Sequence, residues 1–326
     1  MEYINVVVDA MGTDFAPEPE VKGAMAAIKL IDNLKVTLIG DKNEIDKHLT
    51  DDTRIEVIHA EEFVDINKEP VMEIRKKRKS SMVLAFGKVK TTDDTAFVSG
   101  GSTGAIVAGA QLLVGRIKGI KRPALAPIVP TIDGEGVILC DVGATPEIKL
   151  DFIIQNAIMA NAYAKVRGIE NPRIGLLNIG AEEKKGSEVY IEVHKKLKEF
   201  DFNFIGNVEA RDLTSSDADV IVCDGFTGNV AIKVMEGSVK TLLSIIKTQL
   251  KSTITSMFGA ILASGAFKRV KMALDYEETG GALLLGIKKP IIKAHGSSND
   301  KALMNAIILA HKTVEQNLIE TIESNI

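Results

Sequence analysis

The chain has 326 residues, of which 45% are hydrophobic, so it is long enough to bury a large core. Forty basic and 44 acidic side chains give a net charge of −4, which argues against a general nucleic-acid-binding protein. The only two cysteines, Cys140 and Cys223, each end an apolar run. We therefore expect no disulfide framework, no metal site and a reducing compartment.

Two kinds of targeting segment are missing from the sequence. No uncharged apolar run is long enough to cross a membrane. The first eight residues contain an acid, Glu2, and lack the basic start and long apolar core of a secretory signal. A cytoplasmic protein is the expectation.

Short apolar runs alternate along the chain with stretches of helical periodicity. The expected strands are residues 5–8, 35–39, 55–58, 96–98, 137–139, 173–177, 202–205, 220–222 and 290–292. Continuous apolar strands separated by helices indicate a largely parallel sheet, because the crossover helices cover both of its faces. We expect an α/β fold in three layers, with Pro123, Pro127 and Pro130 marking a connection between two halves.

Several expected strands end in a small polar cluster that precedes a helix. Four such clusters are residues 9–12, 99–104, 141–143 and 224–229. In open parallel sheets the ligand binds beyond the carboxyl ends of the strands, so these clusters should converge. Glycines allow a close approach to a ligand, and helix starts bind anions, so phosphate is the expected ligand.

The second cluster contains Gly101, Ser102, Thr103 and Gly104 and leads into a helix expected at 105–114. Both hydroxyls are suited to capping that helix and to binding an anion, and an ordinary glycine-rich turn is the alternative. Neither GxGxxG nor GxxxxGK[ST] occurs, which disfavours a typical dinucleotide or nucleoside-triphosphate enzyme.

Two further clusters carry several reactive side chains. Asp224, Thr227 and Asn229 precede a helix expected to begin near Val230, and three polar side chains exceed what a cap needs. His295 follows the strand at 290–292 and precedes a helix expected at 301–318. It is a candidate donor or general acid, with a purely structural histidine as the alternative.

A cationic loop at residues 180–186 places Lys184 near a strand end, where an anionic substrate would arrive. A solvated charge run is the alternative.

Residues 237–274 contain no Asp or Glu but six basic side chains. Apolar residues recur there near helical spacing, and Gly259 and Gly265 are expected to divide the helix. A basic amphipathic helix binds anionic bilayers. A buried dimer interface or core helix is the alternative for this segment, which we place at about 238–274.

The run from Asp9 to Glu18, DAMGTDFAPE, resembles the opening signature of the phosphate acyltransferase (PlsX) family. Matching segments follow in order at 99–105, 141–144, 178–180, 183–186, 203–209, 223–229, 276–278 and 294–298. The sequence departs from the family at Ser102, where Asn is more common, and at 145–147, where Asn-Val-Asp is more common. Side-chain roles are therefore open at those positions.

The resemblance implies transfer of a long acyl chain from acyl-acyl-carrier-protein to inorganic phosphate, giving acyl phosphate for phospholipid synthesis. It also implies a homodimer that associates peripherally with the membrane and needs no cofactor. The implied fold is that of phosphotransacetylases and isopropylmalate dehydrogenases, with two intertwined subdomains sharing a cleft. This implication agrees with the wiring expected from the strand pattern.

Phosphate is itself a nucleophile, so the reaction needs no covalent intermediate, in keeping with the lack of a Ser or Cys triad. We expect Asp9, Gly12 and Asp14 to shape the cleft. Phosphate would be held by two turns and their neighbours: Gly101, Ser102, Thr103 and Gly104, then Thr227, Gly228 and Asn229, with Gly296 and Ser297. Lys184 would offset the charge of attack, Asp224 would orient Lys184 or His295, and His295 would donate to the oxyanion or thiolate.

Two rival functions remain at this point. A decarboxylating dehydrogenase of the related fold would need a divalent metal and an arginine-rich carboxylate clamp, and the polar clusters supply few arginines. A non-catalytic membrane scaffold would explain the basic segment but not the convergent polar loops.

Overall fold

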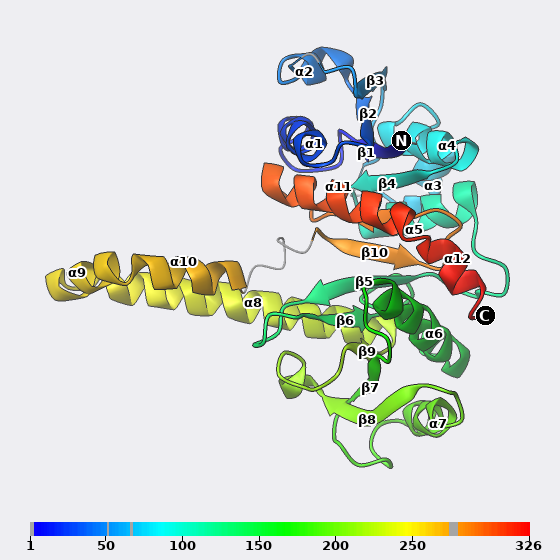
Figure 1. Cartoon of the computed structure of the whole chain (residues 1–326), viewed down its shortest axis with the longest axis vertical. Coiled ribbons are helices and arrows are strands. Elements are labelled where there is room, and N and C mark those ends of the chain that lie inside the picture. Colours follow the sequence, from blue (N-terminus) through cyan, green and yellow to red (C-terminus); the bar gives the residue numbers. More distant parts are fainter. Residues whose placement is uncertain (1–2, 51, 66–67, 274–279) are drawn as a thin grey trace.

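A computed structural model describes residues 3–50, 52–65, 68–273 and 280–326. Eleven strands form one sheet in the order β3-β2-β1-β4-β11-β10-β5-β6-β9-β7-β8 (Figure 1). The strands are β1 (Ile4–Asp9), β2 (Leu34–Gly40), β3 (Ile55–His59), β4 (Thr95–Ser99), β5 (Ala124–Val129), β6 (Val137–Cys140), β7 (Arg173–Asn178), β8 (Asn203–Glu209), β9 (Val220–Val222), β10 (Ala282–Leu285) and β11 (Ile291–Lys293). Only the pairs of β10 with β11, β10 with β5 and β5 with β6 are antiparallel. The largely parallel sheet is therefore confirmed.

Helices cover both faces of the sheet. The α-helices are α1 (Glu18–Leu30), α2 (Lys42–Asp46), α3 (Pro70–Lys76), α4 (Ser81–Thr91), α5 (Thr103–Gly109), α6 (Leu150–Val166), α7 (Glu188–Leu197), α8 (Gly225–Leu250), α9 (Ile254–Leu262), α10 (Ser264–Ala273), α11 (Asp300–Glu315) and α12 (Leu318–Glu323). A π-helix, η1 (Ala110–Val114), continues α5, and a short 3₁₀-helix, η2 (Ala210–Asp212), follows β8. One core layer contains residues of α1, α6, α7, α11 and α12, and the other contains residues of α3, α4, α5 and α8.

The continuous apolar strands follow from this double coverage. Val6 and Val8 of β1 face the first core, whereas Val7 between them faces the second, and all three are fully buried. Successive side chains of a strand point to opposite faces, so a sheet covered on both sides needs apolar residues at every position. The three-layer α/β expectation is confirmed.

Strands β5 and β10 were not expected, and for β5 the reason is its prolines. Three prolines in and around β5 disfavour a strand, since proline cannot donate to the ladder. Pro127 pairs with Ala282 at one end of the ladder to β10, and only Ile128 and Val129 pair with β6. The proline therefore sits at the margin of both ladders, where its missing N–H costs little.

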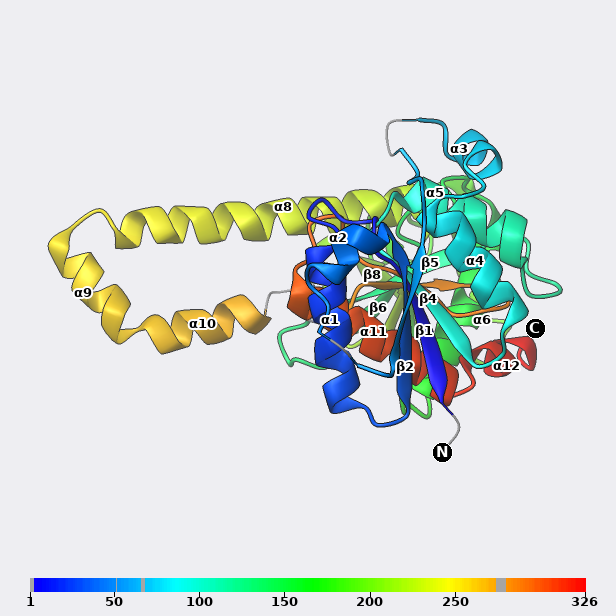
Figure 2. The same cartoon turned by 90° about the horizontal axis from the view of Figure 1, so that it is seen from above.

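The chain returns to its first half at the end. Strand β11 pairs in parallel with β4, and helix α11 lies beside α1 on the first core layer (Figures 1 and 2). Helix α11 ends earlier than expected, and Asn317 adopts a left-handed conformation before α12 begins. This wiring fits two intertwined halves, although the subdomain division stays a prediction.

Helix α8 begins at Gly225, earlier than the Val230 expected, and its second half projects from the body together with α9 and α10 (Figure 2). We call residues Gly237 to Ala273 the arm. The breaks fall at 251–253 and at Ala263, so the expectation that Gly259 and Gly265 divide the segment is wrong. Both glycines are tolerated inside α9 and α10. Among the described helices, none is long and apolar enough to cross a membrane.

Candidate active site

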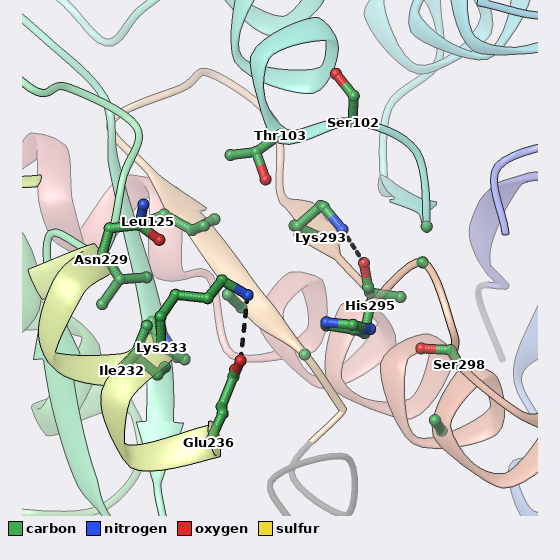
Figure 3. A pocket seen from close by; sticks show the side chains of 18 of the residues that line it. Ser102, Thr103, Leu125, Asn229, Ile232, Lys233, Glu236, Lys293, His295 and Ser298 are labelled. Carbon is green, nitrogen blue, oxygen red and sulfur yellow. Dashed lines mark hydrogen bonds and ion pairs between the residues drawn. The ribbon is translucent and has the colours of Figure 1, made fainter. Parts of the chain in front are cut away.

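Several of the expected polar loops meet at a cavity of about 350 Å³ at the centre of the sheet's carboxyl edge. We call it the reaction cavity. It is lined by residues of the loops at 12–14, 100–103 and 293–298, by β5 and by one face of α8. Figure 3 shows Thr103, Lys293, His295, Asn229 and Lys233 around it.

The first loop is stabilised from behind by a buried carboxylate. Asp9 Oδ1 accepts a hydrogen bond from Ser81 Oγ at 2.6 Å, and Oδ2 accepts one from Ser99 Oγ at 2.8 Å. Burial raises the pKa of Asp9, and these hydrogen bonds oppose the rise. Asp9 therefore supports the cleft wall, whereas Gly12 and Asp14 line the cavity itself.

A second buried carboxylate supports the same loop. Glu20 Oε1 accepts hydrogen bonds from Thr13 Oγ1 at 2.7 Å and from the Thr13 backbone N–H at 3.2 Å. Its other oxygen is buried without a hydrogen-bond partner, and burial raises the pKa of Glu20 to about 7. Asp14 N donates to Gly296 O at 2.8 Å, so the first loop is also tied to the loop of His295.

Glycines of the first and second loops permit close packing. A Cβ on Gly12 would lie 2.9 Å from the Gly101 nitrogen, and one on Gly104 would lie 2.8 Å from Pro70. Ser102 Oγ accepts from Ala105 N at 3.1 Å and so caps α5. Thr103 points its hydroxyl toward the cavity in Figure 3. Gly104 does not line the cavity, so its role is in packing.

The third cluster, at 141–143, is built around another buried carboxylate. Asp141 accepts backbone N–H groups from Leu125, Gly143, Ala144 and Thr145. Burial raises the pKa of Asp141 to about 6. From this cluster only Val142 lines the reaction cavity, so the cluster fixes loop shape.

Asp224 has a different role from the one expected. It caps α8 by accepting from Phe226 N and Thr227 N, and it also accepts from Thr227 Oγ1 at 2.6 Å and Tyr190 Oη at 2.5 Å. These contacts occupy the buried carboxylate, so the expectation that Asp224 orients Lys184 or His295 is wrong. The Thr227 hydroxyl reaches the Asp224 carboxylate because α8 begins at Gly225, five residues earlier than expected.

The first turn of α8 separates its three polar positions. Asn229 lines the reaction cavity, whereas Thr227 lines a second cavity on another face of the helix. A Cβ on Gly228 would lie 2.0 Å from Asp141 O, so this glycine permits helix packing. Residues 227–229 therefore do not form one phosphate-binding turn.

His295 lies at the cavity with a defined tautomer. Its Nδ1 accepts the backbone N–H of Ser297 at 3.2 Å, so the neutral ring carries its proton on Nε2. Ser297 Oγ lies 2.8 Å from the same Nδ1. Burial and then Lys293 lower the pKa of His295, which favours a neutral imidazole. Gly296 lines the cavity, and Ser297 positions the ring from outside it.

Matching to known proteins identifies the chain. Residues 4–321 match the family model described as "Fatty acid synthesis protein". The chain is 48% identical over 322 residues to "Phosphate acyltransferase" of Bacillus cereus (strain B4264), covering 98% of each chain. It is also 48% identical over 324 residues to the Bacillus licheniformis protein of that name, covering 99% of this chain and 98% of that one. The chain belongs to the phosphate acyltransferase family.

A solved structure supports the fold of this phosphate acyltransferase. A phosphotransacetylase from Streptococcus pyogenes superposes with a TM-score of 0.62 at 18% identity, covering 96% of this chain and 94% of that one. The phosphotransacetylase-like fold expected from the resemblance is thereby confirmed. The family membership shows an enzyme that transfers an acyl group to phosphate.

Two lysines at the cavity, Lys233 and Lys293, were not among the expected site residues. Lys293 ends β11 and donates to Ala294 O, and burial, with a contribution from Lys233, lowers its pKa to about 8. Lys233 comes from the third turn of α8 and pairs with Glu236 at 3.1 Å, drawn as a dashed line in Figure 3. The position of Lys293 directly after the expected apolar strand at 290–292 is the sequence feature that could have identified it. Lys233 could be placed only once α8 was known to start at Gly225.

Lys184 lies elsewhere. It is exposed on the loop after β7 and lines neither the reaction cavity nor the second cavity. We therefore assign it no role in the reaction cavity of its own chain. The matching segment at 276–278 lies outside the described residues.

Proposed function

We propose that this phosphate acyltransferase transfers a long acyl chain from acyl-acyl-carrier-protein to inorganic phosphate in the reaction cavity, supplying acyl phosphate for phospholipid synthesis. The observation that carries the proposal is the pair of cations, Lys233 and Lys293, facing one cavity with Thr103 and Asn229. Two positive charges and two neutral polar groups complement a phosphate anion.

Lys293 is partly buried, whereas Lys233 is exposed, so Lys293 is the stronger of the two cations. Charge interactions strengthen when solvent is excluded, and a phosphate anion would stabilise the protonated amine. Lys233 is more exposed and already pairs with Glu236, so it is suited to guiding phosphate and neutralising part of its charge. We place phosphate between Lys293 and the Thr103 hydroxyl, with Gly12, Gly101, Ser102 and Gly296 forming the surrounding wall.

His295 then acts on the thioester. A phosphate oxygen attacks the thioester carbon, a C–O bond forms, and the C–S bond breaks with the thiolate as leaving group. The Nε2–H of neutral His295 donates to the developing oxyanion or to the departing sulfur. Asp14 lies on the opposite loop and favours the protonated state of both Lys293 and His295.

The arm supports peripheral membrane binding and homodimer formation as part of the same proposal. Phe258, Ile261 and Leu262 of α9 are mostly exposed, and Leu262 is 89% exposed. Lys240, Lys247, Lys251, Lys268 and Arg269 also belong to the arm, which has no acidic residue to oppose an anionic surface or an acidic carrier protein. An apolar face bordered by cations binds anionic bilayers.

The proposed reaction can be tested with purified protein, palmitoyl-acyl-carrier-protein and labelled phosphate, without nucleotide or added metal. We expect labelled acyl phosphate and free carrier protein in equal amounts. Absence of product from a folded protein with several chain lengths would contradict the proposal.

A further inference from the structure

A second cavity, of about 660 Å³, lies at the carboxyl ends of β7 and β8, on another face of α8. We call it the groove. Its walls include Leu177, Leu213, Val230, Val234 and Met235, and nothing in the reaction scheme above uses it.

Most of the groove wall is aliphatic, and three of its polar side chains are engaged within the chain, while Arg211 pairs with Glu209 at 3.1 Å. Tyr190 Oη and Thr227 Oγ1 both donate to Asp224, and Asn178 Nδ2 donates to Lys185 O at 3.1 Å. A ligand in the groove therefore meets mainly aliphatic surface with few unsatisfied hydrogen-bonding atoms. A hydrocarbon chain fits such a wall, because burying it there leaves few polar groups without partners.

Met235 connects the groove to the reaction cavity. Met235 lines both cavities. The polar face of α8 borders the reaction cavity, and its aliphatic face borders the groove. The end of β5 forms part of the reaction cavity, and just beyond it Ile132 N donates to Thr214 O on the groove wall. Methionine is flexible and unbranched, so it can move to admit a chain between the two spaces.

We propose that the groove binds the hydrocarbon chain of the acyl donor, with Met235 as the threshold between the reacting carbonyl and the chain. This inference rests on the proposed function, because it assumes that the thioester reacts in the reaction cavity. Each methylene buried in the groove strengthens binding roughly fourfold. Long chains would thus be selected by the groove and short chains would not.

A matched pair of variants tests the groove. Ala210 is exposed and lines the groove, so Ala210→Phe fills it without displacing a buried neighbour. Ser215 is exposed nearby and does not line it, so Ser215→Phe adds similar bulk outside. We expect Ala210→Phe to lower kcat/KM for palmitoyl-acyl-carrier-protein at least about tenfold, to leave the butyryl donor within about twofold, and Ser215→Phe to change neither. Equal rates for Ala210→Phe and the unaltered protein with the palmitoyl donor would overturn the inference.

A photoreactive palmitoyl thioester with a diazirine at the chain end gives a second readout. Labelling of Leu213, Val230 or Val234 supports the inference, and labelling confined to other regions overturns it. The molar mass in solution is measured alongside, because a dimer that Ala210→Phe dissociates would assign the groove to a second copy of this chain instead. If no donor yields acyl phosphate, the proposed function fails, and the labelling pattern still decides what the groove binds.

Discussion

The two halves of α8 both carry apolar side chains, but among the described residues the half nearest the body packs into the core, whereas the half in the arm leaves large apolar side chains exposed. Ile232 is 8% exposed and belongs to the second core layer, whereas Leu242 and Ile245 in the arm are each 54% exposed. Helical periodicity is present throughout, so amphipathicity alone does not identify what a helix contacts. The apolar face of the half nearest the body contacts the sheet. For the half in the arm, we propose contact with an external surface.

The body and the arm also differ in how their cations are paired. Lys233 has an acidic partner one turn away, and Lys293 is partly buried beside the loop of Asp14. The arm contains no carboxylate to pair with its cations. We therefore expect substitutions in the body to affect chemistry and substitutions in the arm to affect surface binding.

The largest expected effect is on turnover. Lys293→Met keeps the length of the side chain and removes its charge, so we expect at least a hundredfold loss of kcat/KM, equivalent to about 3 kcal/mol. Lys195→Met changes an exposed lysine of helix α7, so it provides the matched control and should remain within about twofold. Near-normal turnover of the folded Lys293→Met protein would remove this lysine from the mechanism.

The next largest effect is on membrane binding. Phe258→Asp combined with Leu262→Asp places two charges on the most exposed part of the arm, and we expect at least a tenfold loss of binding to anionic vesicles. Turnover of a short, water-soluble donor should change less than twofold. Ile132→Asp alters an apolar side chain that is 83% exposed on the body and should leave vesicle binding intact.

The double variant Phe258→Asp, Leu262→Asp also tests whether the arm is a dimer interface instead of a membrane-binding surface. If vesicle binding persists while the molar mass falls to that of a single chain, the exposed face serves a dimer interface. Light scattering measured with the vesicle assay makes that distinction.

A smaller effect is expected from pH. Lys293 loses its proton as the pH rises through about 8, so phosphate affinity should fall by up to about tenfold for each further pH unit. The KM for phosphate between pH 7 and 9.5 measures this change. Lys293→Arg stays protonated across that range and should remove the break near pH 8, whatever its overall rate.

The smallest expected effect is on stability. The pKa of Glu20 is raised to about 7 in the folded chain, so the native state takes up a proton between pH 8 and 6 that the unfolded chain does not. Folding should therefore be about 1 kcal/mol more stable at pH 6 than at pH 8 from this group. Urea unfolding measures the difference, which Glu20→Gln should reduce. An unchanged pH dependence in that variant would assign the effect to other carboxyls.

Much of the fold could be predicted because its strands are buried on both faces. The runs around Val6, Leu38 and Val98 contain consecutive apolar residues, and such runs stand out from the polar loops that follow them. Strand β5 did not stand out in this way, because its prolines disfavour a strand although the segment pairs within the sheet. The start of α8 was placed too late because Asp224, Thr227 and Asn229 suggested a loop, although Asp224 is the N-cap and the other two already lie in the helix.

The sequence by itself determined the α/β class, the convergence of polar loops at one sheet edge and the acyl-transfer family. Periodicity, strand-end glycines and ordered motifs are local properties of the chain, so they can be read without coordinates. Only the tertiary structure decided that Asp224 faces Tyr190, that Lys293 and Lys233 share a cavity, and that Lys184 lies outside it. Those relations join segments far apart in the chain, and they depend on the direction of each side chain and the solvent excluded around it.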